Sequence, residues 1–153
     1  MLLLMQFVLA HIGPKAPGGD EFSALSALYL KRTSAFVPAE AMAFRGEEDL
    51  LNWMERKQGR TPAVAVLLDS HGRKMTSEEF AKWIGERRDH GAQQMVFAVG
   101  PASGWSEGAR KRAQLLLSLG SLTMAHALAR LVLAEQLYRA CTILAGHPYH
   151  TGH

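Results

Sequence analysis

Apolar and polar residues alternate in blocks along this chain, and most blocks predict one strand or one helix. The runs at residues 2–12, 61–69 and 93–100 are apolar almost throughout. Such runs are typical of strands whose two faces are both buried in a parallel sheet. A shorter apolar stretch at residues 39–44 predicts a further strand.

Helical spacing separates these strands. Apolar positions recur every three or four residues in four segments, and Thr76 with Glu79 forms a capping box that begins a fifth helix. The four segments span residues 20–32, 47–57, 106–116 and 126–145. Strands that alternate with helices of this length indicate an α/β fold with a mainly parallel sheet flanked by helices. No repeat, low-complexity tract or long linker divides the chain, so we expect one domain over residues 1–153.

The amino-acid composition is that of an ordinary globular protein. The apolar fraction is 48% and the charged fraction 20%, which is ordinary for a globular protein in water. The one cysteine, Cys141, lies in an apolar helical stretch and is expected to be buried and inert, and it excludes a disulfide framework and a cysteine-based zinc site. The first ten residues lack basic charge and are too short to span a bilayer. They predict a buried strand rather than a signal peptide, and the whole pattern suits a cytoplasmic protein.

Charge is distributed unevenly. The formal net charge is +3, and the whole excess lies in residues 101–153, which also hold four of the seven histidines. A basic end with titratable imidazoles is compatible with a phosphate-bearing partner. A solvated helix face explains the same charges equally well.

Two glycine-containing segments follow the central strands, at residues 67–72 and 99–105. Ligands of open parallel sheets bind beyond the carboxyl ends of the strands, where glycine allows close approach of the backbone. Leu68 and Gly100 therefore lie where a ligand is expected. The alternative is two tight turns, with Asp69 capping its own loop. Neither segment is a Walker motif or a G-x-G-x-x-G fingerprint, which argues against a nicotinamide-dependent enzyme.

Two later segments carry unusual chemistry. Residues 119–130, LGSLTMAHALAR, combine small residues with a flexible glycine and an abrupt helix start at His126. The tail at residues 146–150, GHPYH, sets two histidines and a tyrosine around a proline, which stiffens the backbone towards an extended form. Small side chains in the first segment let backbone N–H and C=O groups face a planar ligand such as adenine. Taken alone, however, this segment favours the alternative, a fifth core strand that meets a helix capped by His126.

Together these segments resemble the SPOUT methyltransferases, specifically the small family that methylates N3 of a pseudouridine in large-subunit ribosomal RNA. The stretches LLDSHGRKMTSEEFA, VFAVGPASG, LTMAHALAR, EQLYRA and GHPYH carry the resemblance. It implies a homodimer, a C-terminal trefoil knot within about residues 66–150, and S-adenosyl-L-methionine as cofactor. By position, the cofactor contacts fall on Leu68, Gly100, Leu119, Gly120, Ser121, Leu122, Thr123 and Met124.

The resemblance also implies roles for the basic and tail residues. His150 and then His147 are candidates for the base that removes the N3 proton, because histidine titrates near neutral pH. Tyr149 would contact the target base, and Arg130 would stabilise the developing anion or hold a phosphate, although a plain ion pair with Glu135 is an alternative. Ribosomal RNA would contact a basic rim made of Arg110, Lys111, Arg112 and Arg139. We expect no metal site, although His147, His150 and His153 recur at every third position.

Other functions stay open. Pro101 stands where the family usually has a second glycine, and Ala125 where it usually has proline. These departures motivate a second hypothesis, a non-catalytic RNA- or ribosome-binding descendant with a weakened cofactor pocket. A small-molecule α/β enzyme or nucleotide-binding module is a third.

Overall fold

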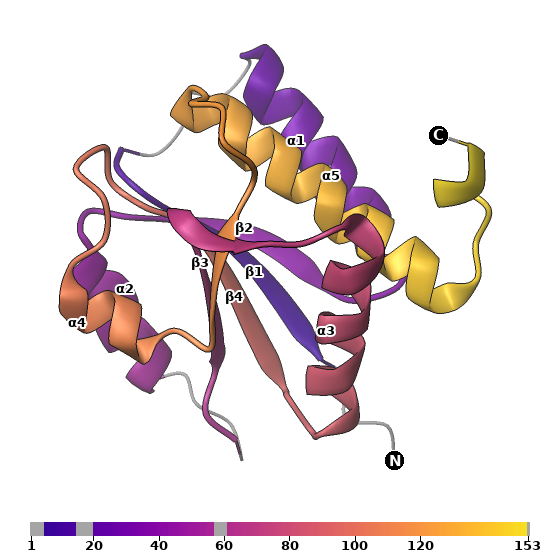
Figure 1. Cartoon of the computed structure of the whole chain (residues 1–153), viewed down its shortest axis with the longest axis horizontal. Helices are drawn as coiled ribbons and strands as arrows, with labels where there is room; N and C mark the ends of the chain where they lie inside the picture. Colours follow the sequence, from indigo (N-terminus) through magenta and orange to yellow (C-terminus); the bar gives the residue numbers. More distant parts are fainter. Residues whose placement is uncertain (1–4, 15–19, 57–60, 153) are drawn as a thin grey trace.

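A computed structural model describes residues 5–14, 20–56 and 61–152 of the chain (Figure 1). Five strands form one sheet in the order β2-β1-β4-β3-β5, and every pairing is parallel. The strands are β1 (Gln6–Ile12), β2 (Ala39–Phe44), β3 (Val64–Lys74), β4 (Gln94–Val99) and β5 (Leu115–Ser118). The predicted parallel α/β architecture is therefore confirmed.

The helices cover both faces of the sheet, as the apolar runs require. They are α1 (Glu21–Thr33), α2 (Glu47–Arg56), α3 (Ser77–Asp89), α4 (Glu107–Arg112) and α5 (His126–Ala145). Phe7 and Leu9 of β1 pack with residues of α1, α3 and α5, whereas the intervening Val8 and Ala10 pack with α2 and α4. Alternate residues of a strand point to opposite faces, so helices on both sides of the sheet bury all the residues of an uninterrupted apolar run.

Local signals fix several helix ends. The side chain of Thr76 accepts from the backbone N–H of Glu79, and Glu79 accepts from the N–H of Thr76, so the predicted capping box begins α3. The hydrogen bond from the backbone N–H of Thr76, followed by one with its side chain, lowers the pKa of the Glu79 carboxyl. At the other end of the chain, Gly146 adopts a left-handed conformation, with φ 71°, and ends α5. The bounds predicted for this helix, 126–145, are confirmed.

The helix predicted at residues 106–116 is wrong in its second half. Helix α4 ends at Arg112, and β5 begins at Leu115, so the apolar segment 119–124 is a loop and not the fifth strand. Gln114 diverts the chain towards β3: its backbone N–H donates to the carbonyl of Ala65 at 2.9 Å, and its side-chain oxygen accepts from the N–H of Ala65 at 2.6 Å. Leu115 and Leu117 of β5 are buried in the core cluster that includes residues of α3 and α5.

Strand β3 also differs from the prediction, because it continues beyond Asp69 to Lys74. Its pairing with β5 shifts register between Leu68 and Arg73, which identifies a bulge. Gly72 lies where a Cβ atom would stand 2.6 Å from the backbone of Leu116, so the close approach of the two strands requires glycine here. Leu68 and Asp69 lie at the start of this bulge, at the edge of the sheet where a ligand is expected.

Some predicted segments extend past the described part of the chain. The first strand was predicted from residue 2 and the second helix to residue 57, and residues 1–4 and 57–60 lie outside the described residues. Within the described ranges, no helix combines the length and the apolar character needed to cross a membrane.

Candidate functional site

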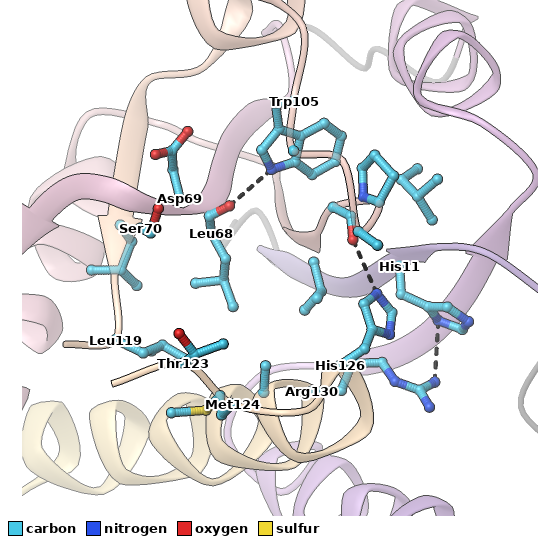
Figure 2. Close-up of a pocket in the computed structure, with 18 of the residues that line it drawn as sticks. His11, Leu68, Asp69, Ser70, Trp105, Leu119, Thr123, Met124, His126 and Arg130 are labelled. Carbon is cyan, nitrogen blue, oxygen red and sulfur yellow. Dashed lines mark hydrogen bonds between the residues drawn. The ribbon is translucent and has the colours of Figure 1, made fainter. Parts of the chain in front are cut away.

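A cavity of about 1120 Å³ lies at the carboxyl ends of the strands. Its wall is built from the end of β1, the bulge of β3, the loop after β4, the loop after β5 and the first turn of α5 (Figure 2). All eight residues predicted to contact the cofactor line this one cavity, namely Leu68, Gly100, Leu119, Gly120, Ser121, Leu122, Thr123 and Met124. Three segments that are distant in the sequence thus contribute to the same wall.

The loop after β4 is fixed to the bulge of β3 by a tryptophan. The indole N–H of Trp105 donates to the carbonyl of Leu68 at 2.9 Å, and Trp105 is almost fully buried (Figure 2). A Cβ atom on Gly100 would lie 2.7 Å from the Trp105 ring, so this wall requires glycine at position 100. Pro101 begins a turn in which its carbonyl accepts from the N–H of Gly104 at 2.9 Å. The proline that departs from the family pattern is therefore accommodated in a turn.

The loop after β5 is held by its own polar groups. The hydroxyl of Ser118 donates to the carbonyl of Gly120 at 3.1 Å and accepts from the N–H of Gly120 at 3.2 Å. Gly120 has φ 124°, a conformation that other residues rarely adopt. The ammonium of Lys74 donates to the hydroxyl of Ser121 at 2.8 Å, which links the loop to the end of β3. Small residues here serve backbone geometry as well as access to the cavity.

A partly buried polar cluster lines the cavity at the start of α5. The imidazole of His126 lies with Nε2 3.1 Å from the carbonyl of Gly100, and its ring contacts that of His11 edge-on (Figure 2). Because a carbonyl only accepts, His126 donates from Nε2. The N-cap of α5 is Ala125, and no side chain caps it, so the interpretation of His126 as a mere helix cap is wrong. Its ring joins α5 to the loop after β4 instead.

Arg130 follows His126 by one helical turn and lines the same cavity. Its Nη1 lies 3.3 Å from Nδ1 of His11 at the end of β1. The alternative pairing of Arg130 with Glu135 is wrong, since Glu135 forms an ion pair with Arg139, with 2.7 Å between Nη2 and Oε1. His11 was not predicted; the one signal for it was a polar residue near the carboxyl end of an apolar strand.

The remaining catalytic candidates lie elsewhere. His147, Tyr149 and His150 follow the C-terminal end of α5, and none of them lines the cavity. A helix of 20 residues is about 30 Å long, so the tail and the cavity lie at opposite ends of α5 within one chain. Figure 1 shows the tail beyond the end of α5, away from the loops around the cavity.

The tail packs onto its own helices. The rings of Tyr149 and Tyr138 meet edge-on at 4.7 Å between centroids, and His147 meets Phe36 in the same way at 6.2 Å. Beyond Pro148 the chain turns into a short 3-10 helix, so the tail is not extended as predicted. The hydroxyl of Thr151 donates to the carbonyl of Pro148 at 2.8 Å and stabilises this turn.

Two charged groups hold the tail. Tyr149 donates from its hydroxyl to Glu135 at 3.3 Å, and the guanidinium of Arg139 lies 5.0 Å from the centroid of the Tyr149 ring. Burial is the main cause that raises the pKa of Tyr149, to about 12, and a hydrogen bond with Tyr29 and the charge of Glu135 raise it further. The Tyr149 phenol is therefore a hydrogen-bond donor at neutral pH.

The basic residues of the predicted RNA rim divide into two groups. Arg110 forms an ion pair with Asp69 at the cavity, while Lys111 is exposed beside it on α4. Arg112 donates to the carbonyl of Ala63 at 3.2 Å. Arg139 lies in the tail cluster, apart from these three. Asp69 also accepts from the N–H of His71 at 2.8 Å, so the expectation that it caps its own loop is confirmed.

The histidine series of the tail was considered as a metal site in the sequence. Among the described residues, no group of three or more histidines, cysteines or acids could hold a metal ion. His153, the last member of the histidine series, lies outside the described residues. Burial raises the pKa of Cys141 to about 12, so this thiol stays protonated.

Comparison with known proteins agrees with this geometry. The family described as "Predicted SPOUT methyltransferase" matches residues 5–150. The ribosomal RNA large subunit methyltransferase H of Koribacter versatilis is 49% identical over 84% of this chain and 88% of its own length. That of Brucella ovis is 43% identical over 92% of this chain and 83% of its own length. The chain belongs to the ribosomal RNA large subunit methyltransferase H family of SPOUT methyltransferases.

A solved structure shares the fold of this SPOUT chain. The SpoU methyltransferase AviRb from Streptomyces viridochromogenes, in complex with AdoMet, superposes with a TM-score of 0.52 at 16% identity. The match covers 94% of this chain, which spans about three fifths of AviRb, or 59% of that protein. At this identity the likeness concerns the α/β fold alone.

Proposed function

We propose that this protein binds S-adenosyl-L-methionine in the cavity at the carboxyl ends of its strands and methylates ribosomal RNA of the large subunit. The convergence of the three predicted segments on one cavity supports the proposal most directly. Membership in the ribosomal RNA large subunit methyltransferase H family, and the names of the relatives, support ribosomal RNA as substrate. The finer part of the proposal is transfer to N3 of a pseudouridine.

The residues of the cavity fit the cofactor. Leu68, Leu119 and Met124 give apolar walls suited to a planar adenine, and the backbone of the loop after β5 offers N–H and C=O groups beside them (Figure 2). Gly100 also lines the cavity, and it has no room for a Cβ atom because the Trp105 ring packs directly against it. When bound, S-adenosyl-L-methionine supplies an electrophilic methyl group on sulfur.

This chain would contribute positioning, exclusion of water and proton handling. An imide N3–H is a poor nucleophile until it loses its proton, so a base and a positive charge near the acceptor both favour transfer. Arg130 at the cavity can supply the charge. His150 is the proposed base, with His147 as second candidate and Tyr149 as a neutral partner for the target base. Arg110, Lys111, Arg112 and Arg139 are the proposed contacts for RNA phosphates.

The position of the tail makes a homodimer part of this proposal. Within one chain, α5 separates the tail from the cavity, so a tail can complete a site only in a second copy. Large apolar side chains are exposed on α1, where Phe22, Leu25 and Leu28 are each 39–45% accessible, and on the neighbouring α5, where Leu128 is 38% accessible. A two-fold contact of antiparallel α5 helices over this face would bring each tail to the opposite cavity.

The C-terminal trefoil knot, the single-domain organisation and a cytoplasmic location complete the proposal.

Two measurements test it. Calorimetry with S-adenosyl-L-methionine is expected to give saturable binding at one site per chain. Incubation with methyl-labelled cofactor and ribosomes, isolated large subunits or free ribosomal RNA is expected to label one pseudouridine in the preferred substrate. Absence of cofactor binding together with retained ribosome binding would instead establish the non-catalytic descendant, which Pro101 and Ala125 motivate. Labelling at another base would contradict the N3-pseudouridine assignment alone.

A further inference from the structure

A histidine on β1 makes two polar contacts with opposite requirements at the edge of the cavity. His11 is only 7% exposed, and both ring nitrogens are engaged. Nε2 lies 3.0 Å from the carbonyl of Pro14. Nδ1 lies 3.3 Å from Nη1 of Arg130, and a dashed line marks this contact in Figure 2. The carbonyl can only accept and the guanidinium can only donate. One species satisfies both partners, the neutral imidazole with its proton on Nε2.

This arrangement gives Arg130 its orientation. Nε of Arg130 is buried and has no hydrogen-bond partner among the described residues, so His11 is the acceptor that holds the guanidinium. The carbonyl of Pro14 holds the His11 proton on Nε2. Nδ1 therefore keeps its lone pair and accepts from the guanidinium of Arg130. Both side chains line the cavity. The cavity wall thus holds a positive charge that is hydrogen-bonded to the imidazole of His11, while the carboxylate of Asp20, at the start of α1, attracts it electrostatically.

We propose that His11 is a positioning residue, which holds the Arg130 guanidinium towards the reacting nucleobase and releases it when Nδ1 is protonated or removed. This inference rests on the proposed methyl transfer. The base that receives the methyl group becomes negatively charged when N3 loses its proton, and a fixed guanidinium stabilises that charge better than a mobile one because it needs no reorganisation. When Nδ1 of His11 is protonated, its N–H points at an N–H of the Arg130 guanidinium, so the hydrogen bond is lost. The imidazolium also places a second positive charge beside that of Arg130.

The surroundings favour the neutral form of His11 at neutral pH. Burial lowers its pKa most, the Pro14 carbonyl opposes this shift, and the charges of Arg130 and His126 lower the pKa further. Arg130 and His126 face the ring from α5, whereas the neighbouring strands place the apolar Val99 and Ala43 opposite His11. Because the pKa is depressed, the pair is intact at neutral pH and breaks as the pH falls below the ordinary histidine range.

Three variants separate positioning from structure. His11→Leu removes the acceptor, and His11→Asn keeps an acceptor oxygen near the position of Nδ1. His90→Asn is the matched control, since His90 is exposed at the end of α3. We expect His11→Leu to lower kcat by roughly 10-fold to 100-fold, the range of a hydrogen bond to a charged group. The KM for S-adenosyl-L-methionine should change little, and His11→Asn should recover most of kcat.

The pH profile and the imidazole resonances give readouts that a structural role would not move. The ratio of wild-type to His11→Asn turnover should fall as the pH decreases, because only the wild type has an imidazole to protonate at position 11. Nitrogen NMR of the wild-type dimer should find His11 unprotonated at Nδ1 and protonated at Nε2. If His11→Leu does not fold, the His11→Asn ratio decides the question.

The outcomes distinguish this inference from the proposed function. Normal kcat in folded His11→Leu, a constant ratio across pH, or a proton on Nδ1 would overturn the role of His11 while methyl transfer stands. No transfer by the wild type to any ribosomal substrate would overturn the proposed function, and the catalytic role of the pair with it.

Discussion

Nη1 of Arg139 lies 2.9 Å from Nδ1 of His150, and this contact holds the tail on its own α5. Because a guanidinium only donates, the Nδ1 lone pair of His150 is occupied and its proton is on Nε2, which lies 3.5 Å from the carboxylate of Glu78. In this state His150 has no free lone pair to accept a proton. Catalysis by His150 therefore requires that one of these contacts breaks, as docking on a second chain or on RNA could cause.

Gly100→Ala tests the cofactor wall. The added Cβ would lie 2.7 Å from the Trp105 ring, which itself is held by the carbonyl of Leu68. We expect overpacking to cost about 1–3 kcal/mol of unfolding free energy and to weaken cofactor binding in calorimetry. Gly108→Ala on α4 is the control, since its nearest neighbour would be Ser106 at 3.8 Å. The control should be neutral or more stable by up to about 1 kcal/mol. Equal cofactor affinity in both variants would contradict this wall.

His150→Ala tests the base. We expect methyl transfer to be abolished while the dimer stays folded and binds S-adenosyl-L-methionine normally, because His150 is partly exposed and lies apart from the cavity. Single-turnover transfer, sedimentation and calorimetry measure the three properties. His90→Ala, an exposed histidine of α3, controls for loss of a surface imidazole. Normal turnover of His150→Ala would remove this residue from the mechanism and leave His147 as candidate.

Mixed dimers test which tail completes which site. In the proposed homodimer, Gly100→Ala weakens a cavity and His150→Ala removes the base of a tail, so each homodimer should be nearly inactive at a cofactor concentration well below that which saturates Gly100→Ala. If tails act across the dimer, a mixed dimer has one site with both parts intact. Random exchange should then restore about a quarter of wild-type transfer, since half of the dimers are mixed and each has one active site of two. Recovery that stays at the level of the separate variants would show that the tail does not act across the dimer.

The sequence predicts the fold better than it predicts the polar contacts. Thr76 with Glu79, and Gly146, are local signals whose geometry needs no tertiary information, and both helix ends lie where predicted. The helix predicted through residue 116 failed because Gln114 pairs with Ala65, a contact 49 residues away that overrides helical spacing. Short strands such as β5 depend on such contacts.

The candidate site also combines features that the sequence predicted with contacts that it did not predict. The eight predicted cofactor contacts follow from the family resemblance, and the structure brings all eight to one cavity; their contact with the cofactor stays a prediction. His11 was missed because its partner Arg130 is 119 residues distant, and because a polar residue in an apolar strand has many possible roles. The tail was expected to be extended, yet Pro148 and Thr151 turn it into a 3-10 helix.

Tyr149 is expected to act as a neutral hydrogen-bond donor. Burial is the main cause that raises its pKa from 10.0 to about 12, so the phenol stays protonated at every pH of a transfer assay. A phenol whose pKa is raised on folding stabilises the fold fully below pH 10.0, and this contribution is lost as the pH rises towards about 12. Ultraviolet titration should find one late-ionising tyrosine that disappears in Tyr149→Phe. An ordinary titration, or a shifted pH–rate profile in Tyr149→Phe, would contradict this assignment.

Arg130 and Arg139 lie on the same helix, yet their substitutions should have opposite consequences. Arg130 faces the cavity and bonds to His11, so Arg130→Ala should reduce turnover far more than thermal stability. Arg139 pairs with Glu135 and holds His150, and its pKa is raised chiefly by the hydrogen bond to Glu135, so Arg139→Ala should lower Tm and loosen the tail. Turnover on ribosomes and thermal melts of both variants give the comparison. If Arg130→Ala lowers Tm strongly while kcat persists, Arg130 is structural and the positive charge of the cavity has no part in methyl transfer.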